Sequence, residues 1–372
     1  MIKVLIRNIR GNIMNKRGFS IPELMIALAI ASVIGMASYT IFSSSNRTYK
    51  VQEDVVEAQQ NLRMAMDRIS KDIRGAGFGL PNPPFTITIG TQTFTAPVTV
   101  ANNSAGVSPE APNTDTITLV GLGYEVATLV NQGVNLCSNG IGCNTAGANC
   151  LCIDKDDSLF SGASVTVIST RKYITIGGEA YLELIDGPHD RAKRILKLDP
   201  ATLLHTYPDS SNTKLCIIQA VKYNIDLVPT VVGGVTTTIP VLMMEDYTGL
   251  RGSGRNIFAD YIEDMQFAYG LDGTIGPDFK KDGKVDDKNG NGTFDEKDFR
   301  FSEVGDAAID DTTSIMAVRV SLVARARNGD LKAGNVFNRP ALEDRAAGAK
   351  DNIRRRVLSS IVKLRNPKVG GH

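Results

Sequence analysis

An uncharged apolar run near the N-terminus constrains this chain more than any other feature. It covers residues 24–42, which is 19 residues without a charge. About 20 apolar residues in a helix span the ~30 Å hydrocarbon core of a bilayer. Residues 1–18 hold five basic side chains and no acidic one. Because basic residues flank only the N-terminal side, the run predicts a single membrane span with a cytoplasmic N-terminus and an exported body.

The run itself does not look like a cleaved secretory signal. Such signals have a shorter apolar core that is closed by small residues in an A-x-A pattern, and neither 32–38 nor 38–44 has that pattern. A plain signal anchor is therefore the simplest interpretation of the run alone. Glu23 does not suit a plain anchor, because a carboxylate at the edge of the hydrocarbon is costly without a partner.

The junction between the basic head and the apolar run reads KRGFSIPEL over residues 16–24. This motif resembles the class III signal of type IV prepilins. The resemblance implies cleavage after Gly18, N-methylation of Phe19 by the prepilin peptidase, and pairing of Glu23 with the N-terminal amine of a neighbouring subunit. Pro22 stands where many family members have an apolar residue. After cleavage it lies in the first helical turn, where its missing N–H is not needed.

The leader changes how the overall charge is understood. The whole chain has 41 basic and 40 acidic residues, a balance that argues against a general nucleic-acid binder. Without residues 1–18 the balance is 36 basic against 40 acidic, so the exported body is mildly acidic. Met14 is an alternative start that would leave a leader of five residues, and the sequence leaves both starts open.

A second helical pattern follows the apolar run. Apolar side chains recur at spacings of three and four residues, as on one face of a helix: Val51, Val55, Ala58, Leu62, Met66, Ile69 and Ile73. The glycines at 75 and 77 end the pattern. We therefore expect a helical segment over residues 19–76, with a transmembrane stem at 19–42 and an amphipathic part at 43–76. A helix from about residue 19 to residue 74 would be roughly 84 Å long at about 1.5 Å per residue.

The residue pattern of 77–372 predicts a β-rich globular head. Alternating apolar residues and turn-forming clusters predict the following strands: a hairpin at 85–95, then 115–122, 164–170, 179–185, 215–225, 257–269, 315–326 and 354–364. A helix followed by an antiparallel sheet is an α+β arrangement. We expect the sheet to bury its apolar face on the helix stripe, as in the type IV pilin fold.

Three segments sharpen the family resemblance. Residues 258–269 (FADYIEDMQFAY), 318–325 (VRVSLVAR) and 354–366 (RRRVLSSIVKLRN) resemble strands of PilW-type minor pilins. The resemblance implies a minor pilin at the filament tip or in a priming complex, with major and minor pilins, the prepilin peptidase and the inner-membrane assembly platform as partners. It also implies an inner-membrane protein with a periplasmic head before assembly and a surface pilus afterwards.

Two other classes of protein stay open. The large J-type pseudopilin of type II secretion has a similar stem. A membrane-anchored periplasmic binding or catalytic protein would share only the anchor. Enzyme motifs for nucleophilic, zinc-dependent or nucleotide-binding catalysis do not occur, so we expect no enzymatic activity.

An acidic insert at 272–312 contains a loop that resembles a cation site. Residues 287–298 (DKNGNGTFDEKD) follow the EF-hand spacing, with Asp in place of the final Glu. The predicted calcium ligands are Asp287, Asn289, Asn291, Thr293 (through its carbonyl), Asp295 and Asp298. The alternative is a solvated acidic turn, because Asp, Asn and Gly also form turns.

Five cysteines follow the membrane span, where oxidation is allowed and disulfides are expected: Cys137, Cys143, Cys150, Cys152 and Cys216. A bond between Cys137 and Cys143 would close a short loop, leaving Cys150 or Cys152 to pair with Cys216. Other connectivities stay open. A zinc site is an alternative, although the spacing of the first four cysteines is not a usual zinc pattern.

Overall fold

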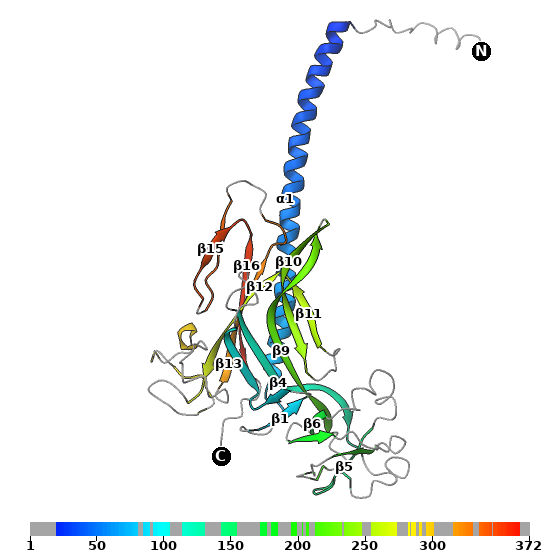
Figure 1. Ribbon diagram of the computed structural model, residues 1–372, viewed down its shortest axis with the longest axis vertical. Helices are drawn as coiled ribbons and strands as arrows, with labels where there is room; N and C mark the ends of the chain where they lie inside the picture. The colour runs from blue at the N-terminus through cyan, green and yellow to red at the C-terminus, as the bar shows by residue number, and fades with distance from the viewer. Residues whose placement is uncertain are drawn as a thin grey trace, which may run out of the picture. The chain divides into compact units, whose positions relative to one another are not determined.

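A computed structural model gives the architecture of the chain (Figure 1). It describes residues 20–80, 85–89, 92–104, 114–130, 143–154, 172–176, 180–184, 195–198, 203, 206–207, 213–232, 234–247, 254–273, 282, 284–287, 290–291, 295–300, 315–329, 335–343 and 345–364. The chain forms two compact units, residues 1–54 and residues 55–372.

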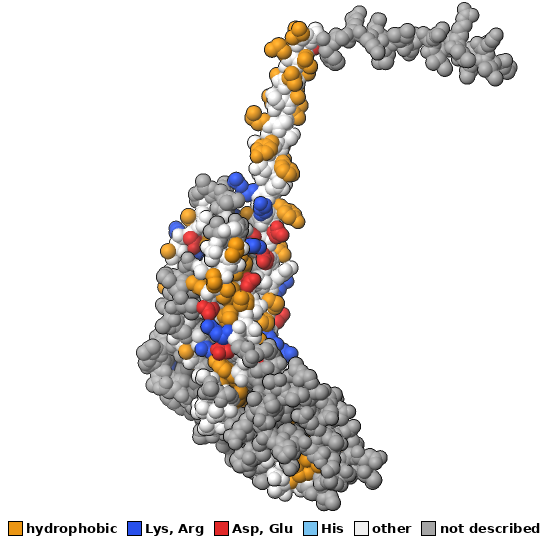
Figure 2. Space-filling model, turned by 45° about the vertical axis from the view of Figure 1, so that its right-hand side comes forward, with side chains coloured by type: hydrophobic (Ala, Val, Ile, Leu, Met, Phe, Trp, Pro, Cys, Tyr) orange, Lys and Arg blue, Asp and Glu red, His pale blue; other side chains and the backbone are white. Residues whose placement is uncertain are grey.

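A single helix, α1, covers Ile21–Gly75. Its apolar 18-residue window has a mean hydropathy of 2.0 with none of it buried, so the helix is long and apolar enough to cross a membrane. Figure 2 shows apolar side chains around this part of the helix. Further along, a buried face runs from Ala58 to Ile73. The predicted helix is thus confirmed, but Val51 and Val55 are only half-buried, so the buried stripe begins later than the sequence pattern indicates.

A seven-stranded antiparallel sheet forms one wall of the head. Its main order is β11-β10-β9-β4-β3, and β6 and β7 extend it beside β9. The strands have the following bounds: β3 Val98–Ser104, β4 Thr114–Thr128, β6 Lys172–Ile176, β7 Ala180–Leu184, β9 Lys214–Val232, β10 Val235–Asp246 and β11 Gly254–Asp260.

A three-stranded antiparallel sheet of order β12-β13-β16 forms the second wall. Its strands are β12 Ile262–Leu271, β13 Ile315–Arg325 and β16 Arg355–Lys363. Small two-stranded pairs complete the described strands: β1 Ile87–Ile89 with β2 Gln92–Phe94, β5 Cys150–Cys152 with β8 Ile195–Lys197, and β14 Phe337–Arg339 with β15 Gly348–Asp351.

The main core joins both sheets to the helix. Its members include Leu62 and Ile69 of α1, Tyr223 of β9, Phe267 of β12 and Val320 of β13, all no more than 3% exposed. The expectation of one sheet on the helix stripe is therefore incomplete, because two sheets share that stripe. The α+β class and the long N-terminal helix of the pilin fold are confirmed.

The two sheets are joined at Tyr261, where the predicted strand 257–269 proves wrong as a single element. It is two strands, β11 and β12, which pair in different sheets. Tyr261 between them has a φ of 59°, a left-handed conformation that is uncommon for a bulky residue. The amide of Asn61 in α1 donates to the carbonyl of the adjacent Asp260 (3.1 Å) and ties this corner to the helix.

Three close contacts hold the end of α1 and the two sheets together. A Cβ on Gly121 of β4 would lie 2.2 Å from the Gly75 carbonyl oxygen, so only glycine allows the helix end to approach this strand. The Gly77 N–H then donates to the Val120 carbonyl (2.9 Å). Between the sheets, the Phe267 N–H donates to the buried Asp115 carboxylate of β4 (2.9 Å).

Candidate functional site

The stem begins with a cap made by its own residues. The Ser20 N–H and Oγ both donate to Glu23 Oε2, at 3.0 and 2.9 Å, and the Glu23 N–H approaches Ser20 Oγ at 3.4 Å. This reciprocal arrangement is a capping box, which satisfies donors at the first turn of a helix. Gly18 and Phe19 lie outside the described residues. The predicted pairing of Glu23 with a neighbouring amine stays a prediction.

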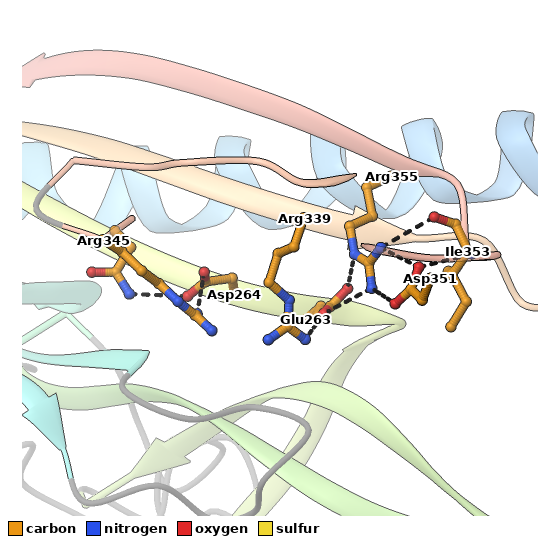
Figure 3. A network of polar contacts seen from close by, with 8 residues as sticks. Glu263, Asp264, Arg339, Arg345, Asp351, Ile353 and Arg355 are labelled. Atoms are coloured by element: carbon orange, nitrogen blue, oxygen red, sulfur yellow. Dashed lines mark hydrogen bonds and ion pairs between the residues drawn. The ribbon is translucent and has the colours of Figure 1, made fainter. Parts of the chain in front are cut away.

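The acidic pair Glu263–Asp264 is the centre of a polar network in the head (Figure 3). Both residues lie at the start of β12, where a register shift against β13 occurs between Ile262 and Asp264. Both carboxylates are buried, with 1% exposure. An isolated buried carboxylate is very costly, so this position requires cationic partners.

Three arginines from the C-terminal segment supply those partners. Arg339 at the end of β14 pairs with Glu263, and Arg355 at the start of β16 donates to the same carboxylate (2.6 Å). Arg345, in the connection between β14 and β15, pairs with Asp264. The β14–β15 hairpin and its connection are therefore fastened to the start of β12.

The network continues to Asp351 at the end of β15. Arg355 donates to both of its oxygens, at 2.7 and 2.5 Å, and also to the Ile353 carbonyl (3.1 Å). Burial alone would raise the pKa of Asp351, but the hydrogen bonds from Arg355 and from the Ile353 N–H outweigh it and lower that pKa. At Asp264, by contrast, burial raises the pKa, and Arg345 opposes the rise only in part.

A second group of contacts fastens the same connection to β13. Arg319 pairs with Glu343, and the Ser321 hydroxyl donates to that carboxylate (2.6 Å). Ser321 also shares a hydrogen bond with Ser359 of β16 (2.7 Å). We call the two groups together the ion-pair clamp; its charged members are Glu263, Asp264, Arg319, Arg339, Glu343, Arg345, Asp351 and Arg355. With four charges of each sign, the clamp is neutral.

A groove adjoins the clamp on the side of α1. Its cavity volume is about 520 Å³. Val55, Ala58, Val336 and Phe337 contribute apolar wall, and Lys350, Arg354 and Arg356 contribute basic side chains. No acidic residue belongs to this lining. The Arg354 guanidinium lies over the Phe337 ring at 4.9 Å from its centroid, a cation–π contact that fixes one side of the opening.

The acidic loop is only partly described. Asp287 Oδ1 accepts the N–H groups of Gly290 and Asn291, at 2.7 and 3.2 Å. The Asn291 amide donates to Asp295 (2.8 Å), and the Asp295 N–H donates to Asp298 Oδ2 (2.7 Å). Four predicted ligands, Asp287, Asn291, Asp295 and Asp298, are thus linked one to the next by local hydrogen bonds.

The remaining predicted ligands, Asn289 and Thr293, lie outside the described residues. Within the described part of the chain, no group of three or more His, Cys, Asp or Glu side chains lies close enough together to hold a metal ion. The donor groups present are all oxygens, as calcium prefers. The calcium site stays a prediction.

The cysteines pair differently from the expected pattern. Cys143 bonds to Cys150 across seven residues, so the expected Cys137–Cys143 bond is wrong. Cys152 is also disulfide-bonded. Cys216 is a buried thiol in β9, so its expected bond to Cys150 or Cys152 is wrong as well. Sequence spacing failed here because the turn before β5 brings Cys150 next to Cys143.

Comparison with protein families gives two matches. Residues 229–366 match the model described as type IV pilus-assembly protein W, and residues 13–39 match the prokaryotic N-terminal methylation motif. The first match contains every member of the ion-pair clamp. No curated protein and no solved structure matches the chain significantly.

Proposed function

We propose that this chain, which matches the family models of type IV pilus-assembly protein W and of the N-terminal methylation motif, is a PilW-type minor pilin that primes assembly of a type IV pilus and remains at its tip. The observation that carries the proposal is the continuity of α1. One helix contains the apolar stem at one end and packs into the core of the head at the other. A subunit built this way can place its stem among other stems while it presents a large folded head.

Processing follows from the same motif. Prepilin peptidase would cut after Gly18, which frees the Phe19 amine that Glu23 of a neighbour needs. The same peptidase would then methylate that amine. Before assembly the protein would be held in the inner membrane by one span, with its head in the periplasm. Other pilins and the inner-membrane assembly platform would be its partners. Its role would be structural, through packing of stems and heads.

The test combines the mature N-terminus with two phenotypes. Mass spectrometry of the protein from its native host should find N-methyl-Phe19 as the first residue. Deletion of the gene should remove surface pili and leave type II secretion intact, and a complementing Glu23→Ala variant should be processed but fail to restore pili. Loss of secretion with normal pili would favour a pseudopilin. An unprocessed Met1 or Met14 terminus would instead indicate a plain anchor.

We further propose that the loop at 287–298 binds calcium. The support is its EF-hand spacing, its all-oxygen donor set and the local hydrogen bonds that link Asp287 to Asn291, Asn291 to Asp295 and Asp295 to Asp298. Calcium at millimolar concentration should raise the melting temperature of the full chain. The double variant Asp287→Ala with Asp295→Ala should abolish the shift, and Asp282→Ala is the matched control outside the loop. A wild-type protein that shows no shift would rule the site out.

A further inference from the structure

The groove beside the clamp is suited to an acidic and apolar partner. Val336 on its wall is 58% exposed, and Val357, which also belongs to the lining, is 44% exposed. Lys350 and Arg356 are exposed beside these apolar side chains. An exposed apolar surface rimmed by charge is typical of a protein-binding site, and the excess of basic side chains selects for carboxylates in the partner.

The chain itself carries a surface of that chemistry on α1. Tyr49, Glu53, Val56 and Gln60 recur at spacings of three and four residues and therefore share one helix face; we call them the outer stripe. Tyr49 is 70% and Val56 is 51% exposed. Residues 50–60 contain three acids (Glu53, Asp54 and Glu57) and one Lys, for a net charge of −2.

The outer stripe faces away from the core of the head. Ala58 and Leu62, which are buried in that core, are offset by two residues from Val56 and Gln60, about 200° around a helix of 3.6 residues per turn. The stripe therefore cannot reach the groove of its own molecule, whose lining includes Ala58. A second molecule is needed to bring groove and stripe together.

We propose that the groove of one copy binds the outer stripe of a second copy of this chain. Groove and stripe share the same turns of α1, because Val55 and Ala58 line the groove and Val56 and Gln60 belong to the stripe. Two copies with parallel stems at equal depth in one membrane would meet there without any axial shift. The apolar side chains Tyr49 and Val56 enter the groove, and Glu53 and Glu57 lie next to its basic side chains.

This contact is heterologous, because each copy uses two different surfaces. It leaves one stripe and one groove available on a pair of copies, to which further subunits can add. The inference rests on the proposed priming role and adds its first step, a contact between membrane-held subunits before extrusion.

The test is photo-crosslinking in cells that express the full chain and a prepilin peptidase. The photoreactive residue p-benzoylphenylalanine replaces Val336 in the groove or, as a control, Ile361, which is 43% exposed in β16 and does not line the groove. The Val336 variant should give an adduct of twice the subunit mass, mapped by mass spectrometry to residues 47–63 of the second copy. The Ile361 variant should not give that adduct.

Charge reversal identifies the contact more closely. Lys350→Glu should lower the yield of the Val336 adduct about tenfold, because it places like charges together. Glu53→Lys in the second copy should restore the yield. Lys363→Glu, at the far end of β16, is the matched control and should leave the yield unchanged.

The result distinguishes this contact from the wider function. Methylated Phe19 and normal pili, without the mapped adduct, would overturn the contact and leave the minor-pilin proposal standing. An adduct to another protein, or to a different part of the second copy, would overturn it as well. An unprocessed N-terminus would count against the proposed function, whether or not the adduct forms.

Discussion

The C-terminal half of the chain contains two groups of carboxylates that look alike in the sequence but differ in burial and in their partners in the fold. Glu263 and Asp264 are 1% exposed and are paired with arginines from distant segments. Asp287 accepts N–H groups three and four residues further along the chain. The first group fastens parts of the fold that are far apart in sequence, and the second shapes a single turn.

This difference separates a structural role from a binding role. A buried carboxylate whose oxygens are already occupied by guanidinium groups has no capacity for a ligand. A carboxylate in an exposed turn retains coordination sites. The clamp should therefore be needed for the β14–β15 hairpin and the groove that the hairpin lines, whereas the acidic loop should be dispensable for folding. Each of the following predictions tests one part of that division.

Glu263→Ala should have the largest effect. It leaves Arg339 and Arg355 buried without their shared carboxylate, and breaking a buried ion pair in this way costs about 3–5 kcal/mol of folding free energy. Urea unfolding of the full chain in detergent gives the value. It can be followed by tyrosine fluorescence, because the chain has 10 Tyr and no Trp. A loss below about 1 kcal/mol, the range of exposed pairs, would show that the clamp is not structural.

The pair Asp264–Arg345 should show strong coupling. Arg345→Leu alone should destabilise the protein by roughly 2–4 kcal/mol, because the Asp264 carboxylate stays buried without its cation. Replacing both residues with Leu should recover most of that loss, since apolar pairs of similar size often replace buried ion pairs without penalty. A double-mutant cycle from urea unfolding measures the coupling. Additive losses would mean that the two residues act independently.

The sequence predicted the helix and several strands because their physical signals are local. The span at 24–42, the alternation at 87–89 and the apolar strand at 315–325 depend only on neighbouring residues. The sequence predicts a single strand at 257–269 because no local signal at Tyr261 marks a change of sheet. Its left-handed φ is tolerated because the two sheets and Asn61 hold the corner.

The clamp was not predicted, although its acidic pair was visible. Residues 258–269 resemble a strand of PilW-type minor pilins. That resemblance alone does not distinguish Glu263 and Asp264 from solvent-exposed acidic residues. Their partners are 76 to 92 residues away, in segments rich in Gly, Asn and Ala. An acidic pair inside an otherwise apolar strand is the one local signal that could have indicated buried arginines.

A pH titration distinguishes Asp351 from the acidic loop. The pKa of Asp351 is lowered by Arg355, so the pair contributes stability above the unfolded-state value near 3.8. That contribution should be lost as the pH falls from about 4 through the lower folded-state pKa. The melting-temperature difference between wild type and Asp351→Asn should therefore be constant from pH 7 to 5 and vanish towards pH 2. A difference that persists at pH 2 would mean that the carboxylate charge is not what stabilises the fold.

Asp287→Ala should have the smallest effect in the absence of calcium. It removes one acceptor of two N–H groups in an exposed turn, where water replaces the lost bonds, so the cost should be no more than about 0.5 kcal/mol. Asp351→Ala is the matched control, since it removes a carboxylate of the same size that is bound to Arg355. A loss at Asp287 as large as that at Glu263 would mean that the acidic loop is part of the folded core. The division between clamp and loop would then fail.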